Sequence, residues 1–190
     1  MSKQVPVGVS ARHIHLSEEH VHILFGKGYQ LTEMKPLSQP GQYAANETVA
    51  VTGPKGSFGK VRILGPVRKR TQLEVSRTDA FALGVNPPVR ESGDIAGSAG
   101  ITIQGPAGEV VIEEGVIVAA RHIHLHTSDA ERLGIADKQK LRVRVGGDRG
   151  VVFEHVVARV SADFALDMHI DTDEANAAGV KNGDMADIIE

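Results

Sequence analysis

One hexapeptide occurs twice in this chain and constrains the fold more than any other feature. Ala11–Leu16 reads Ala-Arg-His-Ile-His-Leu, and Ala120–Leu125 repeats it letter for letter. Apolar residues lead into each copy, alternating over Val5–Val9 and continuous over Val116–Val118, which predicts that each motif continues a β-strand. Residues i and i+2 of a strand share a face, so the two imidazoles of each motif can converge on one metal ion; on a helix they would diverge.

The duplication also indicates a third ligand in each half. In each half a predicted short helix is followed by a Gly-Val pair, Gly84-Val85 in one and Gly179-Val180 in the other. When these pairs are aligned, Glu74 and His169 occupy equivalent positions on equivalent strands. The candidate ligands then form two sets of three: His13, His15 and Glu74, and His122, His124 and His169. Three protein ligands and an open position are typical of a catalytic zinc site. A lone His-x-His pair would indicate structural histidines, and a lone Glu74 a surface carboxylate; the repeat favours metal ligands.

Composition limits the class of protein. The chain has 190 residues, 41% of them apolar and 24% charged, which is typical of a compact soluble protein of one large or two small domains. Its 21 glycines, 8 prolines and 4% aromatic residues favour short strands and turns, as in small barrels. A net charge of −3 argues against general nucleic-acid binding. The absence of cysteine excludes disulfides, thiolate ligands and a cysteine nucleophile.

No apolar run approaches the roughly 20 residues of a membrane-spanning helix. Met1–Gln4 is too short for a signal peptide, so we expect an intracellular protein.

Short helices are predicted after each hexapeptide. Ser17 is a favourable N-cap for the first, and Ser128–Glu131 reads as a capping box for the second. A third helix is predicted over residues 80–83, capped by Thr78–Asp79. The pair His20-x-His22 falls in the first helix, where its rings lie on different faces, and we interpret both as exposed histidines rather than ligands.

These residues together resemble the PduL-type phosphate acyltransferases (phosphotransacylases) of propanediol-utilisation microcompartments. Besides both Arg-His-Ile-His-Leu motifs, the resemblance is based on Gln39–Ala45, Gly65–Arg68, Thr71–Ser76, Pro88–Arg90 with Ser92-Gly93, and Met168–Asn176. It covers nearly the whole chain. The resemblance implies a mainly β fold of two small barrels related by the duplication and capped by short helices. We expect residues 12–119, with an excursion at about 26–46, to form one barrel, and residues 120–190 with the exchanged N-terminal strand 1–11 to form the other.

The resemblance also implies roles for individual residues. The two ligand sets would hold two zinc ions between the barrels, and Arg68 would bind phosphate. Coenzyme A would contact five further residues, with His169 nearby: Lys35, Arg62, Leu64, Ser92 and Asn176.

The implied reaction is acyl phosphate plus coenzyme A giving acyl-CoA plus phosphate, reversibly, with propanoyl and acetyl as the usual acyl groups. Paired zinc ions can stabilise a developing oxyanion, and the planar guanidinium of Arg68 matches phosphate oxygens. Because the chain lacks cysteine, we expect direct attack of the CoA thiolate rather than an acyl-enzyme. Two alternatives stay open: a di-zinc hydrolase of acyl phosphates or thioesters, and a non-catalytic metal-dependent barrel that binds an anion or a partner protein.

Members found in microcompartments carry an amphipathic N-terminal extension, which this sequence almost lacks. We therefore expect a cytoplasmic enzyme, with the microcompartment lumen as the alternative if an extension was removed. The expected partners are coenzyme A, acyl phosphate, phosphate and a second copy of the chain in a homodimer, with microcompartment proteins as further candidates; neither nucleic acid nor membrane is expected.

Overall fold

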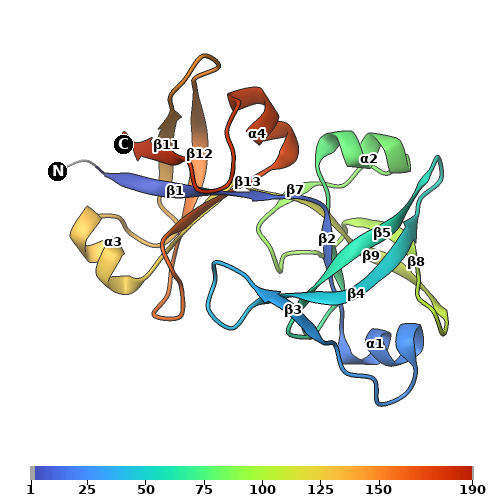
Figure 1. The fold of residues 1–190 in the computed structure, drawn as a ribbon. Helices are drawn as coiled ribbons and strands as arrows, with labels where there is room; N and C mark the ends of the chain where they lie inside the picture. The colour runs from blue at the N-terminus through green and yellow to red at the C-terminus, as the bar shows by residue number, and fades with distance from the viewer. Residues whose placement is uncertain (1–2, 190) are drawn as a thin grey trace. The chain divides into compact units, whose positions relative to one another are not determined.

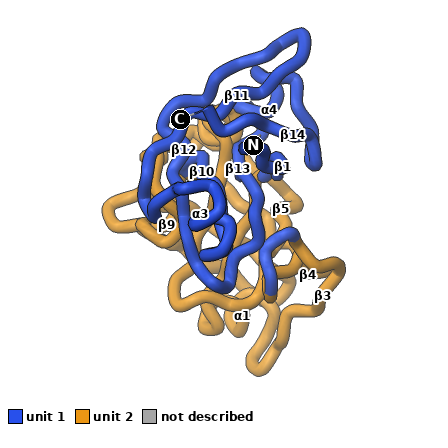
Figure 2. The backbone as a smooth tube through the Cα atoms, turned by 90° about the vertical axis from the view of Figure 1, so that its left-hand side faces the viewer, with its two compact units in different colours: residues 1–10, 38–40, 120–190 blue, residues 11–37, 41–119 orange. Residues whose placement is uncertain are grey.

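The structure is a computed structural model that describes residues 3–189, in which strands dominate and four helices are short (Figure 1). The chain forms two compact units, coloured separately in Figure 2. The unit that we call the N-terminal barrel comprises Ala11–Leu37 and Gly41–Ala119. The C-terminal barrel contains the rest of the described chain, including the short segment Ser38–Pro40.

The C-terminal barrel is a closed ring of six strands in the order β1, β13, β10, β12, β11, β14. These strands are β1 (Gln4–Ser10), β10 (His122–Leu125), β11 (Lys140–Val145), β12 (Val151–Val160), β13 (Asp167–Asp171) and β14 (Met185–Ile188). In Figure 1 the blue β1 lies among the orange and red strands of this unit. It pairs parallel with β13 and antiparallel with β14, so the N-terminal strand closes a ring that otherwise comes from the second half of the chain.

The N-terminal barrel also closes. Its ladders run from β4 to β5, β2, β6, β9 and β8, and β8 pairs with β4 again. These strands are β2 (His13–His15), β4 (Tyr43–Thr52), β5 (Ser57–Gly65), β6 (Gln72–Glu74), β8 (Ala99–Gln104) and β9 (Glu109–Ala119). Two short strands pair outside the ring: β3 (Glu33–Pro36) with β4, and β7 (Val89–Arg90) with β9.

The two rings share one topology. β2 pairs parallel with β5 and antiparallel with β6, and β10 pairs in the same way with β12 and β13. β9 lies parallel to β6 as β1 lies parallel to β13. Each half of the chain therefore gives its first strand to the ring formed mainly by the other half. The predicted mainly β fold of two duplicated barrels with an exchanged N-terminal strand is confirmed.

Each barrel has its own hydrophobic core. The central isoleucine of each motif, Ile14 or Ile123, is fully buried in the core of its barrel. β1 adds Val5 and Val7 to the C-terminal core, and β9 adds Val116 to the N-terminal core. Complete burial of a branched side chain contributes about 1.5–3 kcal/mol. The buried isoleucine of each motif thus fixes which face of its strand lies inward and, with it, which way the histidines point.

The helices lie where the sequence predicted them: α1 (Glu18–Phe25), α2 (Arg77–Leu83), α3 (Thr127–Leu133) and α4 (Thr172–Ala178). Ser17 caps α1 as predicted, because its hydroxyl accepts a hydrogen bond from the backbone N–H of His20. His20 and His22 are half-buried, so the prediction that both are exposed is wrong.

Two predicted caps are also wrong. Ser76 caps α2 in place of Thr78–Asp79, because Ser76 and Asp79 satisfy each other's backbone N–H groups in a capping box. α3 begins after His126, whose Nδ1 accepts from the backbone N–H of Ser128. Sequence rules favour serine over histidine at an N-cap, and here local geometry outweighs that preference.

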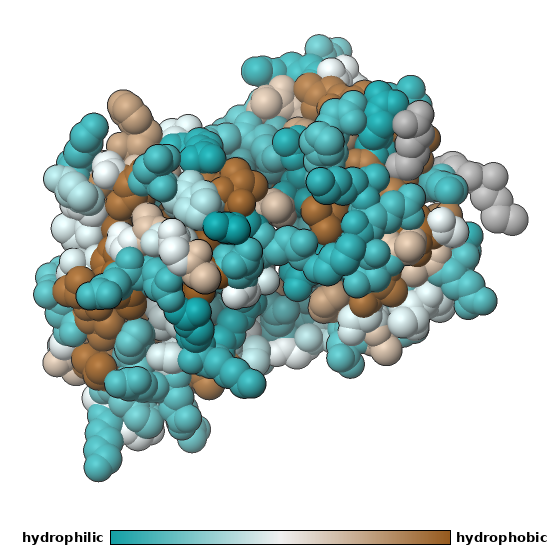
Figure 3. All heavy atoms as spheres, turned by 180° about the vertical axis from the view of Figure 1, so that it is seen from behind, coloured by the Kyte–Doolittle hydropathy of each residue, from teal (hydrophilic) through white to brown (hydrophobic). Residues whose placement is uncertain are grey.

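None of the helices between residues 3 and 189 is long and apolar enough to span a membrane, since the longest has eight residues. On the face seen in Figure 3, hydrophobic residues are interspersed among hydrophilic ones. The most exposed large hydrophobic side chain among the described residues is Phe81 of α2, at 79%.

Candidate metal and phosphate site

Strand geometry brings the two histidines of each motif together. In β2 the rings of His13 and His15 lie 5.2 Å apart, and in β10 those of His122 and His124 lie 4.6 Å apart, between centroids. All four are buried, with exposures of 7% or less. Because the intervening isoleucine points into the core, the histidines point to the opposite face of the strand.

The third member of each set comes from the neighbouring antiparallel strand. Glu74 of β6 lies opposite His13, and His169 of β13 lies opposite His122. Within each set the candidate ligand atoms all lie within 4.8 Å of one another. We call these sets the first cluster (His13, His15, Glu74) and the second cluster (His122, His124, His169). The structure therefore brings together both predicted trios, each on two paired strands of a single barrel.

Backbone carbonyl groups orient the imidazoles. Nδ1 of His13 lies 2.9 Å from the carbonyl oxygen of Ala11, and Nδ1 of His122 lies 2.8 Å from that of Ala120. Nδ1 of His15 lies 3.1 Å from the carbonyl oxygen of Leu64. A carbonyl oxygen only accepts, so in each contact Nδ1 carries the hydrogen and donates it. When such a ring is neutral, its Nε2 carries the lone pair that can bind a metal, which is how ligating histidines are commonly held.

Charge in the first cluster is strongly coupled. Burial opposes ionisation of Glu74, but the charge of His13 and the hydrogen bond from it outweigh burial and hold the pKa of Glu74 well below its usual range. Burial likewise opposes protonation of His13, yet the charge of Glu74 raises its pKa. Burial, His13 and Arg68 together lower the pKa of His15 to about 3. The cluster thus holds an anionic carboxylate beside a neutral His15.

Arg68 lies beside the first cluster. It follows β5 and is fixed there by its backbone N–H, which donates to the carbonyl oxygen of Leu16 at 2.9 Å. Its Nη1 donates to Ser92 Oγ at 3.1 Å. Nε2 of Gln72 donates to the same hydroxyl at 2.9 Å. Arg68 and Ser92, predicted separately for phosphate and coenzyme A, are therefore in contact.

The other predicted coenzyme A contacts are spread along the chain. Arg62 lies opposite His13 in register, and its Nη1 donates to the carbonyl oxygens of Ala45 and Asn46 at 2.8 and 2.9 Å. Leu64 is half-buried and contributes its carbonyl group to His15, as described above. Lys35 is exposed on β3 of the N-terminal barrel, and Asn176 is exposed on α4 of the C-terminal barrel.

Two further residues next to the clusters were not predicted from the sequence. Gln72, two residues before Glu74, donates from Nε2 to Glu74 Oε1 at 2.7 Å. Asp167, two residues before His169, has its Oδ2 3.0 Å from His169 Nε2. Both are buried. The i−2 spacing on a strand would have placed each on the same face as its neighbouring ligand, and this was the available signal.

The arginine of each hexapeptide is also held in the same way in both halves. Arg12 pairs with Asp79 at 2.6 Å, and Arg121 pairs with Glu174 at 3.1 Å. Each guanidinium also lies over a phenylalanine ring of its own barrel, 4.0 Å from the centroid for Arg12. The acidic partner is the capping-box residue of α2 or α4. The arginines therefore tie the start of each histidine strand to a helix and are engaged away from the ligands.

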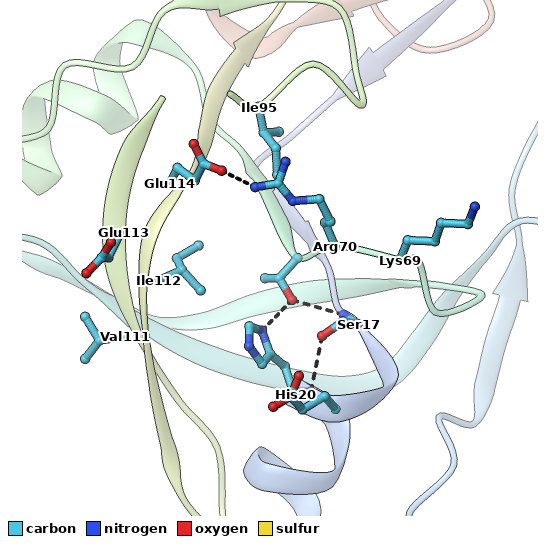
Figure 4. A pocket seen from close by; sticks show the side chains of 11 residues that line it. Ser17, His20, Lys69, Arg70, Ile95, Val111, Ile112, Glu113 and Glu114 are labelled. Carbon is cyan, nitrogen blue, oxygen red and sulfur yellow. Dashed lines mark hydrogen bonds and ion pairs between the residues drawn. The ribbon is translucent and has the colours of Figure 1, made fainter. Parts of the chain in front are cut away.

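A separate open pocket of the N-terminal barrel contains Arg70, Lys69 and His20 (Figure 4). Arg70 forms an ion pair with Glu114. His20 Nδ1 lies 2.7 Å from the hydroxyl of Thr71, and burial lowers its pKa. None of the residues that line this pocket belongs to either cluster.

The donor sets suit a d-block divalent cation. Three imidazoles, or two imidazoles with a carboxylate, are donor sets that catalytic Zn²⁺ sites use, whereas Mg²⁺ and Ca²⁺ prefer oxygen alone. Three donors per cluster leave a coordination position for a substrate atom.

Comparison with known proteins places the chain in a family. The family model for phosphate propanoyltransferase matches residues 6–181. A phosphate propanoyltransferase of Thermotoga maritima is 60% identical over 97% of this chain and 88% of its own length. The phosphate propanoyltransferases of Rhodobacter capsulatus and Listeria monocytogenes are 56% and 50% identical, over 94% and 98% of this chain and 83% and 87% of theirs. The chain therefore belongs to the phosphate propanoyltransferase family of acyltransferases.

Proposed function

We propose that this protein transfers a propanoyl or acetyl group between phosphate and coenzyme A, in either direction, with one zinc ion in each cluster. The observation that carries the proposal is the placement of Arg68 beside a cluster of three metal-type donors. A cation with a planar fork of donors next to a metal site is suited to an acyl phosphate, which carries its negative charge on the phosphoryl oxygens.

Arg68 would bind the phosphate. Its contact with Ser92 orients the guanidinium, whose planar fork of N–H groups matches two oxygens of a phosphoryl group. The hydrogen bonds that Ser92 receives from Arg68 and Gln72 hold this arrangement in place before the substrate arrives. Preorganised donors cost little reorganisation when charge develops on the leaving phosphate.

The first cluster would hold one zinc ion and the second cluster the other. When bound, zinc supplies Lewis-acid stabilisation of negative charge on oxygen and lowers the cost of ionising a thiol. The protein's part is to fix the donors, which it does through the carbonyl contacts of His13, His15 and His122.

Coenzyme A would contact Lys35, Arg62, Leu64, Ser92 and Asn176. Lys35 and Arg62 are cations suited to its phosphate groups. Nη1 of Arg62 donates to two backbone carbonyls, which orients its guanidinium, a group suited to phosphate oxygens.

Direct attack is the simplest chemistry for this chain. The thiolate sulfur of coenzyme A forms a bond to the acyl carbon, and the bond from that carbon to the phosphate oxygen breaks. Phosphate departs with the bonding electron pair and takes up the proton that the thiol gave up. No cysteine is present to carry the acyl group. Glu74 would be engaged as a ligand and His13 with it, which leaves no activated nucleophile among the cluster residues.

The decisive experiment combines metal analysis with a thioester-formation assay on propanoyl and acetyl phosphate. We expect about two zinc ions per chain and thioester formation that depends on them. His122→Ala should lose one zinc ion and nearly all activity while the circular dichroism spectrum is kept. One zinc ion per intact chain would contradict the two-metal proposal, and loss of acyl phosphate without thioester in the presence of coenzyme A would indicate a hydrolase instead.

The homodimer, the cytoplasmic location and the alternative location in a microcompartment stay predictions from the resemblance. Size-exclusion chromatography with light scattering tests the first, and cell fractionation tests the other two.

A further inference from the structure

The residue beside the third ligand differs between the clusters in a matched way. In the first cluster Gln72 lies opposite His15 and donates a hydrogen bond to the Glu74 carboxylate. In the second, Asp167 lies opposite His124, and its carboxylate lies against the His169 ring. In the first cluster a hydrogen-bond donor, Gln72, therefore lies beside a carboxylate ligand, which only accepts. In the second an acceptor, Asp167, lies beside an imidazole ligand, which can donate.

We propose that Asp167 is the positioning residue of the second cluster: it accepts the Nε2–H of His169, so that His169 presents Nδ1 to the metal, and Gly8 provides the space for this pair. The proposal deepens the metal role assigned above and depends on it. It makes His169 differ from His13, His15 and His122, whose Nδ1 atoms are held by carbonyl groups and which present Nε2.

The ring orientation follows from the neighbours of β13, which lies between β1 and β10. Gly8 is the register partner of His169 on β1, and His122 is its partner on β10. A Cβ atom on Gly8 would lie 3.0 Å from Cδ2 of His169, so the Cδ2 edge of the ring faces β1. Nδ1 is on the opposite edge of an imidazole and therefore faces β10, where His122 and His124 lie.

Asp167 is on the β1 side of the ring as well. The same Cβ position on Gly8 would be 3.0 and 3.3 Å from its two carboxylate oxygens. Asp167 is only 6% exposed, and a carboxylate at this depth requires a hydrogen-bonding partner. A carboxylate that accepts from the outer nitrogen of a ligating histidine fixes its tautomer and strengthens its basicity. Asp167 thus brings a carboxyl group to the second cluster, as Glu74 does to the first.

The N-terminal barrel provides an internal comparison. The position equivalent to Gly8 is Ile117 of β9, the register partner of Glu74. Ile117 is fully buried, so this place is filled by an apolar side chain where Glu74 is the ligand. Gly8, Asp167 and His169 thus replace Ile117, Gln72 and Glu74 as a set. Such a joint change is expected if the three residues work together at the metal.

The test measures zinc affinity by chelator competition and the histidine tautomers by ¹⁵N NMR of the zinc-loaded protein. The signals of the His169 ring are identified by their loss in His169→Gln. We expect this ring to be protonated at Nε2 and metal-bound at Nδ1. Asp167→Ala should lower the affinity for one of the two zinc ions by about 10- to 100-fold and leave the affinity for the other unchanged. Asp167→Asn keeps an acceptor oxygen, so His169 should retain its tautomer and the loss of zinc affinity should be smaller than in Asp167→Ala.

Asp163→Asn is the matched control, because it removes an exposed carboxylate from the loop before β13 and should not alter either affinity. Asp167→Asn keeps the size of the side chain and supplies the NMR readout if Asp167→Ala does not fold. Zinc bound at Nε2 of His169, or equal zinc affinity in Asp167→Ala and the parent protein, would overturn the inference. If the parent protein still binds two zinc ions, the proposed function stands. Failure of the parent protein to bind zinc at the second cluster would overturn both.

Discussion

Replacing Gly8 by alanine should weaken zinc binding at the second cluster alone. The new Cβ would lie 3.0 Å from Asp167 Oδ2, 3.0 Å from His169 Cδ2 and 3.3 Å from Asp167 Oδ1, closer than ordinary contacts of about 3.4–4 Å. Overpacking of this kind costs about 1–3 kcal/mol. In the metal-free protein the two side chains can move aside, whereas in the zinc-bound protein His169 is held. The cost therefore falls on the bound state and should lower zinc affinity by about 5- to 140-fold, at tenfold per 1.4 kcal/mol.

The stability of the metal-free protein should change little or rise. Gly8 lies within β1 and has no positive φ, so alanine is compatible with its backbone. Glycine-to-alanine changes at compatible positions stabilise by about 0.4–1 kcal/mol through the unfolded chain, which offsets the crowding. Chelator competition and thermal unfolding with and without zinc separate the two effects. Gly59→Ala is the matched control, because Gly59 is also a strand glycine and a Cβ there would meet nothing within 4 Å. If Gly8→Ala binds both zinc ions as tightly as Gly59→Ala does, the packing argument is wrong.

Three other predictions concern phosphate binding, the route of transfer and pH. Arg68→Ala should raise the KM for phosphate at least tenfold when the thioester is converted to acyl phosphate. Arg70→Ala should change this KM less than twofold, because the Arg70 guanidinium pairs with Glu114. Equal increases for both variants in initial-rate assays would mean that Arg68 is the wrong residue. Initial-rate plots at several fixed coenzyme A concentrations should intersect, because both substrates bind before chemistry; parallel lines, or exchange of labelled phosphate without coenzyme A, would show an acyl-enzyme. Burial would raise the pKa of Glu47, but hydrogen bonds from Thr32 and Tyr29 outweigh burial and lower that pKa. The ionised carboxylate therefore stabilises the fold fully above its unfolded pKa of about 4.3. This contribution is lost as the pH falls through the lower folded pKa. Glu47→Gln should therefore cost about 1–3 kcal/mol in urea unfolding at pH 7 and progressively less in acid, and a cost independent of pH would contradict this assignment.

The sequence was sufficient for the features that depend on local pattern or on the internal repeat. A strand leading into His-x-His places two imidazoles on one face whatever the rest of the fold does, because the period of a strand is two. The repeat then identified Glu74 and His169 as equivalent, and the registers of β6 and β13 place both opposite the first histidine of their motif. Helix positions followed from the pattern, although two caps did not. His126 takes the place of a serine that general preference favours, and Ser76, itself a favourable N-cap, starts α2 earlier than predicted.

Tertiary structure alone decided what surrounds the ligands. The contact of Gly8 with Asp167 and His169 arises from the parallel pairing of β1 with β13, strands from opposite ends of the chain. No local pattern shows which strands become neighbours in a barrel, because backbone pairing is chemically the same for every candidate partner. The same holds for Arg68, whose position beside the first cluster depends on a loop anchored to Leu16 and not on the run of three cations in which it lies. The sequence thus determined which side chains can bind metal, and the packing of distant strands determined how each is held.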